Sequence, residues 1–126
     1  MEKKIVVTSR DYDLMTNYIH HNPKKASSYS MLRLAKELHE AKIVDGDKTP
    51  PGLIGLNSEV LLYEKTLGKE IKAQLVLPKE VSPKLNKISI FSPLALALLG
   101  YREGDTIEWE LIGTIRRYKV LRVTNS

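Results

Sequence analysis

Two short groups of titratable side chains have the types and spacing that could support chemistry. Glu108 and Glu110 lie two residues apart in a segment of alternating polar and apolar residues, so they would share one face of a strand. Paired carboxylates can act as general acid and general base. The same spacing also describes the solvent-facing side of an amphipathic strand, and we favour that interpretation. His20 and His21 could ligate a soft metal, but neighbouring helical residues point about 100° apart, so we expect a solvated helix end instead.

No other catalytic or cofactor-binding pattern stands out. The 126 residues include no cysteine, which excludes disulfides, thiolate metal sites and cysteine nucleophiles. The sequence has no glycine-rich phosphate loop and no serine in a Gly-x-Ser-x-Gly context. We therefore predict no catalytic residue, no metal and no cofactor, and we do not expect an enzyme.

Composition indicates a small globular protein of the cytoplasm. Hydrophobic residues make up 42% of the chain and charged residues 28%, which suits a packed core rather than disorder. No apolar run approaches the ~20 residues of a membrane span, and the N-terminal segment is too polar for a signal peptide. We expect no membrane association.

A formal net charge of +5 leaves open a role in binding nucleic acid. The densest basic cluster lies at residues 115–119, near the end of the chain. A solvated strand face is the interpretation that we favour for this cluster. The alternative is a basic nucleic-acid-binding module, whose phosphate contacts would come from Arg116, Arg117, Lys119 and Arg122.

A Lys-Thr-Pro-Pro-Gly linker at residues 48–52 divides the chain into segments with different periodicities. Residues 1–46 predict a short strand at 5–7 and two helices that form an antiparallel hairpin, a short coiled coil. Thr8 is the expected N-cap of the first helix, with Asp11 as its capping partner. The second helix is expected from about 28 to 43. The tip of the hairpin is basic, and its candidate functional residues are His20, His21, Lys24 and Lys25.

Residues 53–126 alternate with a period of two and predict an antiparallel sheet of about five strands. Trp109 alternates with apolar neighbours, and we expect it at the centre of this core. One short helix at 93–99 interrupts the strands. Ser92 is its expected N-cap, Pro93 its first residue and Gly100 the residue that follows its end. A small sheet with a helix on one face is an α+β fold.

The segment ISIFSPLALALLGYREGDTIEWEL, residues 88–111, resembles the C-terminal domain of the GreA/GreB transcription elongation factors. The resemblance rests on the Ser-Pro pair, the Ala-Leu-Leu-Gly helix end, the Gly-Asp turn and the flanking strands. The likeness extends over about residues 53–123. It implies an FKBP-like fold for the second segment and RNA polymerase as the partner, bound near the mouth of the secondary channel. An FKBP-like fold also suggests prolyl isomerase activity as an alternative function. That activity needs a pocket lined with several aromatic side chains, and the chain has few aromatic residues.

Departures from the usual family pattern suggest a Rnk-like member with a short hairpin. Phe91 stands where the family typically has an acid before Ser-Pro, and Leu96 and Tyr101 stand where basic residues are common. The resemblance implies a polymerase-docking surface at Phe91, Ser92, Pro93, Leu96, Leu99 and Tyr101. A helix that is apolar all round should expose one face on an isolated monomer, and we expect Leu96 and Leu99 there. The alternative is that the hairpin or a second copy covers this face.

The tip of the hairpin implies a regulator without transcript-cleavage activity. Gre factors place acidic residues at the tip of a long coiled coil, where they help to hold a catalytic magnesium ion. Residues 19–28 contain neither Asp nor Glu, and carboxylate oxygen is what magnesium requires. We therefore expect a factor that binds polymerase and competes with true Gre factors for their site.

Overall fold

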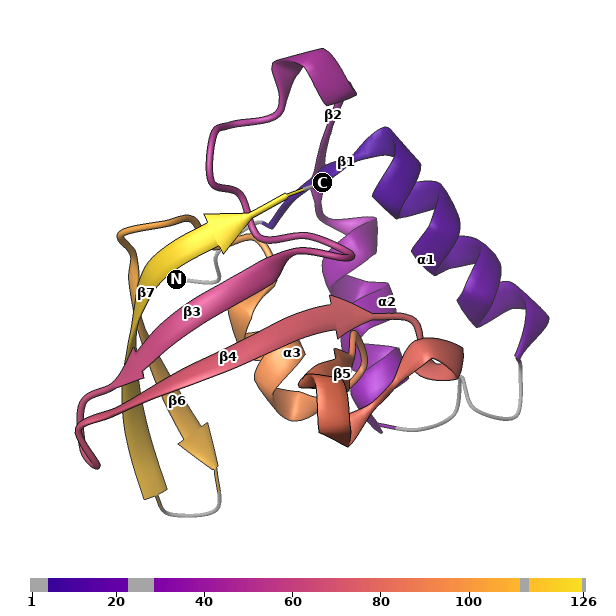
Figure 1. The fold of residues 1–126 in the computed structure, drawn as a ribbon. Coiled ribbons are helices and arrows are strands. Elements are labelled where there is room, and N and C mark those ends of the chain that lie inside the picture. Colours follow the sequence, from indigo (N-terminus) through magenta and orange to yellow (C-terminus); the bar gives the residue numbers. More distant parts are fainter. Residues whose placement is uncertain (1–4, 23–28, 112–113, 126) are drawn as a thin grey trace.

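The computed structural model of this chain describes residues 5–22, 29–111 and 114–125 (Figure 1). Its elements in chain order are β1 (Val6–Thr8), α1 (Ser9–His21), α2 (Tyr29–His39), β2 (Lys42–Val44), β3 (Glu59–Glu64), β4 (Lys69–Val76), β5 (Lys87–Ser89), α3 (Pro93–Leu98), β6 (Thr106–Leu111) and β7 (Thr114–Thr124). Within these ranges, short 3-10 turns lie at Gly46–Lys48, Pro78–Glu80 and Pro83–Leu85. The predicted α+β class is confirmed. No helix among these described ranges is long and apolar enough to cross a membrane.

The N-terminal segment forms the predicted pair of helices, but they are framed by two strands. Thr8 caps α1, because its hydroxyl oxygen accepts the backbone N–H of Asp11 at 3.1 Å. The prediction that the second helix reaches Ile43 is wrong: α2 ends at His39, and β2 pairs with β1 in parallel register. The backbone N–H of Lys42 donates to the carbonyl of Ile5 at 2.9 Å. β-Branched residues at 43 and 44 suit a strand better than a helix.

The second segment forms a five-stranded sheet with the order β5-β4-β3-β7-β6. Its pairs are antiparallel except β4 with β5, which run parallel because the intervening 3-10 turns carry the chain back to the starting side. A uniformly antiparallel sheet was therefore an incorrect expectation at this edge. A bulge shifts the register between β3 and β7: Leu62 lies opposite Val120 and Leu61 opposite Arg122, which leaves Leu121 without a partner residue.

The short helix α3 begins at Pro93 as predicted and ends at Leu98, one residue before the predicted end. The hydroxyl of Ser92 accepts the backbone N–H of Ala95 at 3.3 Å, and Pro93 is the first helical residue. Gly100 follows the helix with a φ of 84°, a conformation that glycine adopts without strain.

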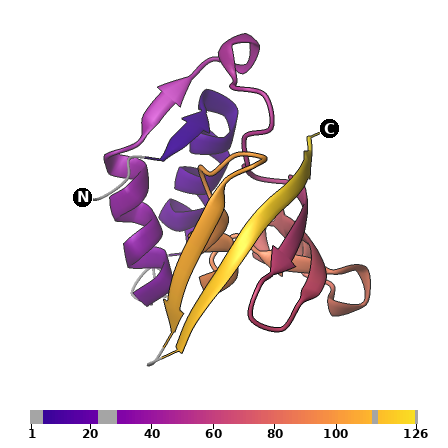
Figure 2. The same ribbon diagram turned by 90° about the vertical axis from the view of Figure 1, so that its left-hand side faces the viewer.

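Both segments contribute to one hydrophobic core. The helices lie on one side of the five-stranded sheet, and the opposite face of the sheet is uncovered (Figure 1 and Figure 2). Leu34 and Leu38 of α2 belong to the same buried cluster as Leu62 of β3 and Leu98 of α3. Ile107 of β6 is also buried in it, whereas the side chain of Trp109 lies outside the described part of the structure, so its central role stays a prediction.

Two close contacts join the N-terminal segment to the loops of the second segment. A carboxylate oxygen of Asp11 accepts the backbone N–H of Leu56 at 3.0 Å, across the boundary that the linker suggests. At the other contact, Gly100 lies so close to Ile5 that a Cβ placed on the glycine would come within 2.8 Å of the Ile5 Cβ. The residues at this boundary are therefore fixed by packing as well as by hydrogen bonding.

A methyl group at position 100 is expected to destabilise the protein. Gly100→Ala combines a positive φ of 84° with the clash against Ile5, and we expect a loss of about 2–5 kcal/mol in the free energy of unfolding. Gly104→Ala is the matched control, because Gly104 has a φ of 93° but no atom near its hypothetical Cβ. Urea unfolding should show the larger loss for Gly100→Ala. Equal losses would mean that the Ile5 contact contributes nothing.

Asp11 should make stability depend on pH in a specific direction. Burial raises the pKa of Asp11 above its ordinary value of 3.8, although hydrogen bonds from Leu56 and Thr8 oppose the shift. A raised carboxyl pKa stabilises the fold below the unfolded-state pKa, and this contribution is lost as the pH rises through the folded-state pKa. Asp11→Asn keeps an acceptor for Leu56, so we expect it to match or exceed the wild-type free energy of unfolding at pH 7.

The advantage of Asp11→Asn over the wild type should shrink as the pH falls from 7 toward 4, measured by urea unfolding at each pH. Asp11→Ala is the control for the lost acceptor, and it should cost about 1–3 kcal/mol by leaving the Leu56 N–H unsatisfied. An advantage that grows on acidification would contradict the raised pKa.

Candidate docking surface

The turn that precedes α3 is held by its own serines. The hydroxyl oxygen of Ser89 accepts the backbone N–H of Phe91 at 3.0 Å, and the Ser89 carbonyl accepts the backbone N–H of Ser92 at 2.9 Å. Ser92 then caps the helix through its own hydroxyl. This chain of bonds fixes where Pro93 projects from the molecule.

Phe91 is held inward by the first helix. Its side chain is buried at 8% exposure, and its ring packs on that of Tyr18 from α1, with 5.2 Å between ring centroids and 32° between planes. Stacked and tilted aromatic pairs of this kind add stability beyond the area that they bury. Phe91 therefore anchors the turn to α1, and its ring is not part of the accessible surface.

The expectation that Leu96 and Leu99 face solvent is wrong. Leu96 is 6% exposed and Leu99 is 1% exposed, because α2 packs on the side of α3 that faces away from the sheet. The alternative that the hairpin covers this face is therefore correct. A charged residue at position 96 would therefore destabilise the core, because burying an unpaired charge is strongly unfavourable.

Tyr101 lies at the opposite end of α3 from Ser92. Its carbonyl accepts the backbone N–H of Ile54 at 2.8 Å, and the Gly100 N–H donates to the Ile54 carbonyl at 3.1 Å. Its side chain is half-buried. Helix α3 has six residues and is about 9 Å long, so the expected docking residues are divided between its two ends.

The accessible part of the expected surface is the N-terminal end of α3. Pro93 is exposed, and Ala97 is half-buried four residues later on the same helix face. Ser92 and Leu94 are also half-buried. We call these four residues, Ser92, Pro93, Leu94 and Ala97, the Pro93 surface. It is small, mostly apolar and held rigidly by the serine bonds beneath it.

The four basic residues expected to contact nucleic acid do not share one environment. Arg117, Lys119 and Arg122 are exposed on β7, on the uncovered face of the sheet. Arg116 is half-buried, and its charge acts on Glu64 and Tyr118, which share the inner face. Arg117 pairs with Glu108 of the neighbouring strand β6 at 3.7 Å, with both side chains well exposed. Glu108 is thus on a solvated face, as expected.

Glu64 is a buried carboxylate that sequence analysis did not single out. Burial opposes its ionisation, but the backbone N–H groups of Leu67 and Thr66 donate to it at 2.6 and 2.9 Å and hold the pKa of Glu64 below its ordinary value. Burial raises the pKa of Tyr118, which lies opposite Glu64 in the sheet. These bonds close the β3–β4 turn, so the role of Glu64 is structural.

Helix α1 ends in two exposed histidines. The rings of His20 and His21 meet edge to face with centroids 5.4 Å apart, and Nδ1 of His21 lies 2.8 Å from the carbonyl of Asn17. Lys24 and Lys25 lie outside the described residues. Among the residues that are described, no group of three or more His, Asp or Glu side chains is placed to hold a metal ion.

Comparisons with known proteins agree with this architecture. The family model for the C-terminal domain of the transcription elongation factors GreA/GreB matches residues 49–125. Transcription elongation factor GreA of Clostridium kluyveri is 30% identical over 124 residues, which cover 96% of this chain and 78% of that protein. GreA of a Chelativorans species is 35% identical over 115 residues, covering 88% of this chain and 73% of the relative.

Solved structures extend the likeness to the whole fold. A prokaryotic transcription elongation factor GreA/GreB from Nitrosomonas europaea superposes with a TM-score of 0.80 at 32% identity, covering 97% of this chain and all of the other. The factor Gfh1 of Thermus aquaticus, at 21% identity and a TM-score of 0.52, shares the fold. The family match, the relatives and the capped Ser-Pro helix together show that this chain belongs to the GreA/GreB family of transcription elongation factors.

Proposed function

We propose that this protein is a Rnk-like regulator that binds RNA polymerase near its secondary channel without stimulating transcript cleavage. It acts on the polymerase and catalyses no reaction itself. Membership of the GreA/GreB family supports polymerase as the partner. The observation that carries the proposal is the combination of an intact Ser-Pro turn, capped and hydrogen-bonded, with a first helix, α1, that ends in His20 and His21.

The Pro93 surface is the proposed point of contact with polymerase. It is apolar, fixed in place by Ser89 and Ser92, and accessible beside the buried leucines of α3. Rigid apolar side chains bind with a small loss of conformational entropy. Leu96, Leu99 and Phe91 contribute indirectly, because their burial sets the position of the helix.

The short hairpin supports the absence of cleavage activity. Helix α1 has 13 residues, so it is about 20 Å long. Asp11 and Asp13 are the acids of α1, and both lie in its first half, far from the tip. A basic tip would occupy the approach to the polymerase active site without delivering carboxylate oxygens to a magnesium ion.

An acidic residue on the Pro93 surface should weaken polymerase binding and leave the fold intact. Pro93→Glu introduces a charge at the first helical position, where acids are tolerated, and we expect at least about a tenfold loss in affinity for core polymerase. Leu67→Glu is the matched control, because Leu67 is 59% exposed at the distant β3–β4 turn. Biolayer interferometry measures both. Unchanged binding of Pro93→Glu, with normal circular dichroism, would exclude the Pro93 surface.

The protein should inhibit a true Gre factor rather than replace it. Titration into backtracked elongation complexes that contain GreA should reduce transcript cleavage in a dose-dependent way, because both factors would occupy one surface. Pro93→Glu should inhibit less, and Leu67→Glu should inhibit like the wild type. Stimulated cleavage with this protein alone would contradict the proposal.

A further inference from the structure

The uncovered face of the sheet carries an apolar row that the core does not use. Leu61 and Tyr63 are outward-facing residues of β3, two positions apart, and Tyr63 is 37% exposed. Successive outward residues on a strand lie about 7 Å apart. Antiparallel sheets commonly leave one face wet, but a solvated central strand usually carries polar residues there. The Leu61–Tyr63 row on β3 is therefore unusual for a face that only meets water.

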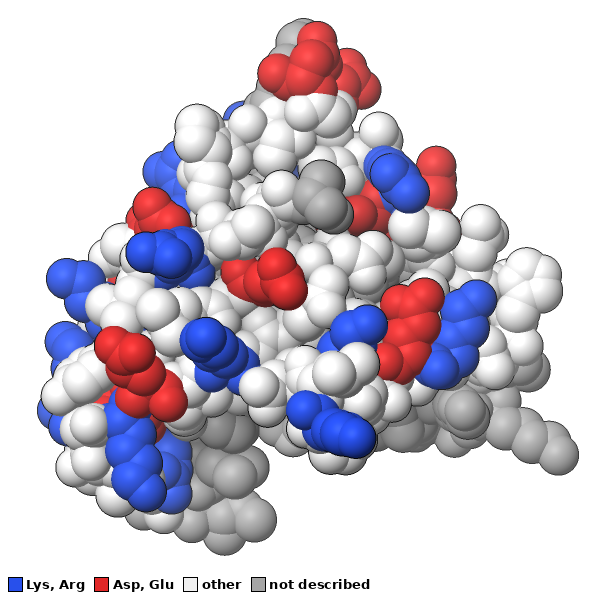
Figure 3. All heavy atoms as spheres, in the orientation of Figure 1, with Lys and Arg blue, Asp and Glu red and all other residues white. Residues whose placement is uncertain are grey.

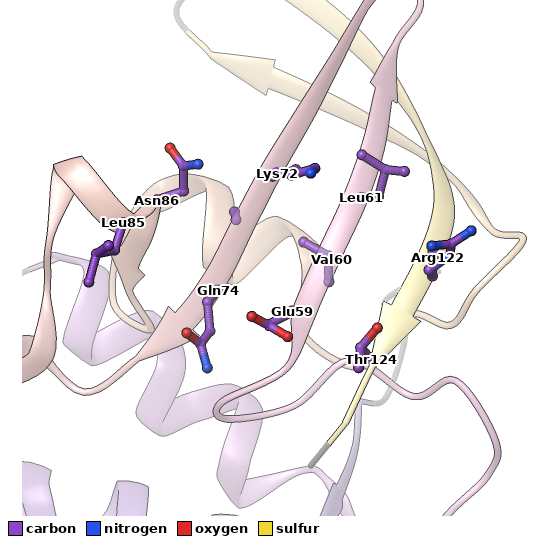
Figure 4. A pocket seen from close by; sticks show the side chains of 10 residues that line it. Glu59, Val60, Leu61, Lys72, Gln74, Leu85, Asn86, Arg122 and Thr124 are labelled. Atoms are coloured by element: carbon purple, nitrogen blue, oxygen red, sulfur yellow. The ribbon is translucent and has the colours of Figure 1, made fainter.

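Cations line one side of this row. Arg122 lies directly opposite Leu61 on β7, and Lys119 lies opposite Tyr63. Arg117, which pairs with Glu108 of β6 at 3.7 Å on the solvated face, follows on the same strand. On the other side, Lys72 of β4 lies opposite Leu61 (Figure 4). In the space-filling view, Lys and Arg side chains gather along the left side of the molecule over β7, with acidic side chains between them (Figure 3).

A shallow groove of about 280 Å³ runs beside Leu61, between Arg122 and Lys72. Its remaining polar lining is supplied by Glu59, Gln74, Asn86 and Thr124, with Leu85 at the rim. This volume lies just below the ~300–1,000 Å³ range of ligand clefts. The groove is thus large enough for one flat group of modest size. Amide and hydroxyl groups of the lining could form hydrogen bonds with the edges of that group.

We propose that this face binds single-stranded nucleic acid, with bases on the Leu61–Tyr63 row and phosphates along Arg122, Lys119 and Arg117. An aromatic residue offers a stacking surface to any base, and a line of cations follows the backbone. The charge pattern favours a backbone that runs along β7. Glu70 lies opposite Tyr63 on β4, on the side of β3 away from β7, so it would repel a backbone that ran there. Glu59 lies opposite Thr124 and beside Arg122, so it would limit the nucleic-acid path at that end of the groove.

This inference is independent of polymerase docking, because the sheet face and the Pro93 surface share no residue. It also differs from the grouping that the sequence suggests. Arg116 belongs to the inner face with Tyr118, whereas Lys72, Leu61 and Tyr63 join the candidate interface from strands that are distant in sequence.

Fluorescence anisotropy of labelled 12-nucleotide RNA and DNA strands tests the proposal with no polymerase present. We expect saturable binding at 50 mM salt and weaker binding of duplexes that hide their bases. Three phosphate contacts predict a slope of roughly −2 for the logarithm of affinity against the logarithm of salt concentration. Poly-glutamate serves as a polyanion without bases. Absence of saturable binding, or equal binding of poly-glutamate, would overturn the proposal.

Two sets of variants locate the interface. Lys119→Glu with Arg122→Glu should reduce affinity at least about tenfold and reduce the slope to roughly −0.7, as expected for one remaining contact. The double variant Lys42→Glu with Lys79→Glu is the control, because it changes the net charge by the same amount at exposed sites outside this face. It should lose much less affinity for the nucleic acid. Equal losses of affinity in the two double variants would mean that overall charge alone explains the binding, and they would overturn the proposal.

Tyr63 separates stacking from electrostatics. Tyr63→Ala should weaken binding by about tenfold with an unchanged salt slope, and Tyr63→Phe should restore binding because its ring still stacks. Circular dichroism and urea unfolding confirm that each variant is folded. Wild-type affinity in a folded Tyr63→Ala variant would contradict a base-stacking role for this face.

Discussion

The structure depends on the burial of one short helix from two sides. Helix α3 has apolar residues all round, so a sheet alone would leave half of its side chains in water. The hairpin supplies the second cover through Leu34 and Leu38 of α2. Burying a leucine side chain contributes about 1.5–3 kcal/mol. The net free energy of unfolding of a domain is only about 5–15 kcal/mol, so the loss of a few buried leucines would be enough to unfold it. The hairpin is therefore part of the fold of the sheet segment.

This arrangement gives the N-terminal segment an influence on the Ser-Pro turn that we propose as the polymerase contact. Tyr18 of α1 packs on Phe91, immediately before the serine that caps α3, and Ile5 packs on Gly100 at its far end. Asp11 adds a hydrogen bond to Leu56. Displacement of the hairpin would remove support from both ends of α3 at once. Positions that look like surface in the sequence thus act through packing.

Local patterns in the sequence predicted most of the elements but few of the contacts between them. Thr8, Ser92, Pro93 and Gly100 were informative because capping and a positive φ depend on nearby residues. The end of α2 and the parallel β5 were missed because they depend on pairing with distant strands. The burial of Leu96 and Leu99 was predicted wrongly, since the sequence of an apolar helix face is the same whether a hairpin or a partner covers it.

Native-state hydrogen exchange across a denaturant series most directly tests the claim that the hairpin and the sheet share one core around α3. The account predicts that backbone amides of Leu34 and Leu38 in α2 open together with those of Leu98 and Leu99, at the same free energy and with the same denaturant dependence. Amides of α2 that exchange through a separate opening of much lower free energy, while α3 stays protected, would contradict it.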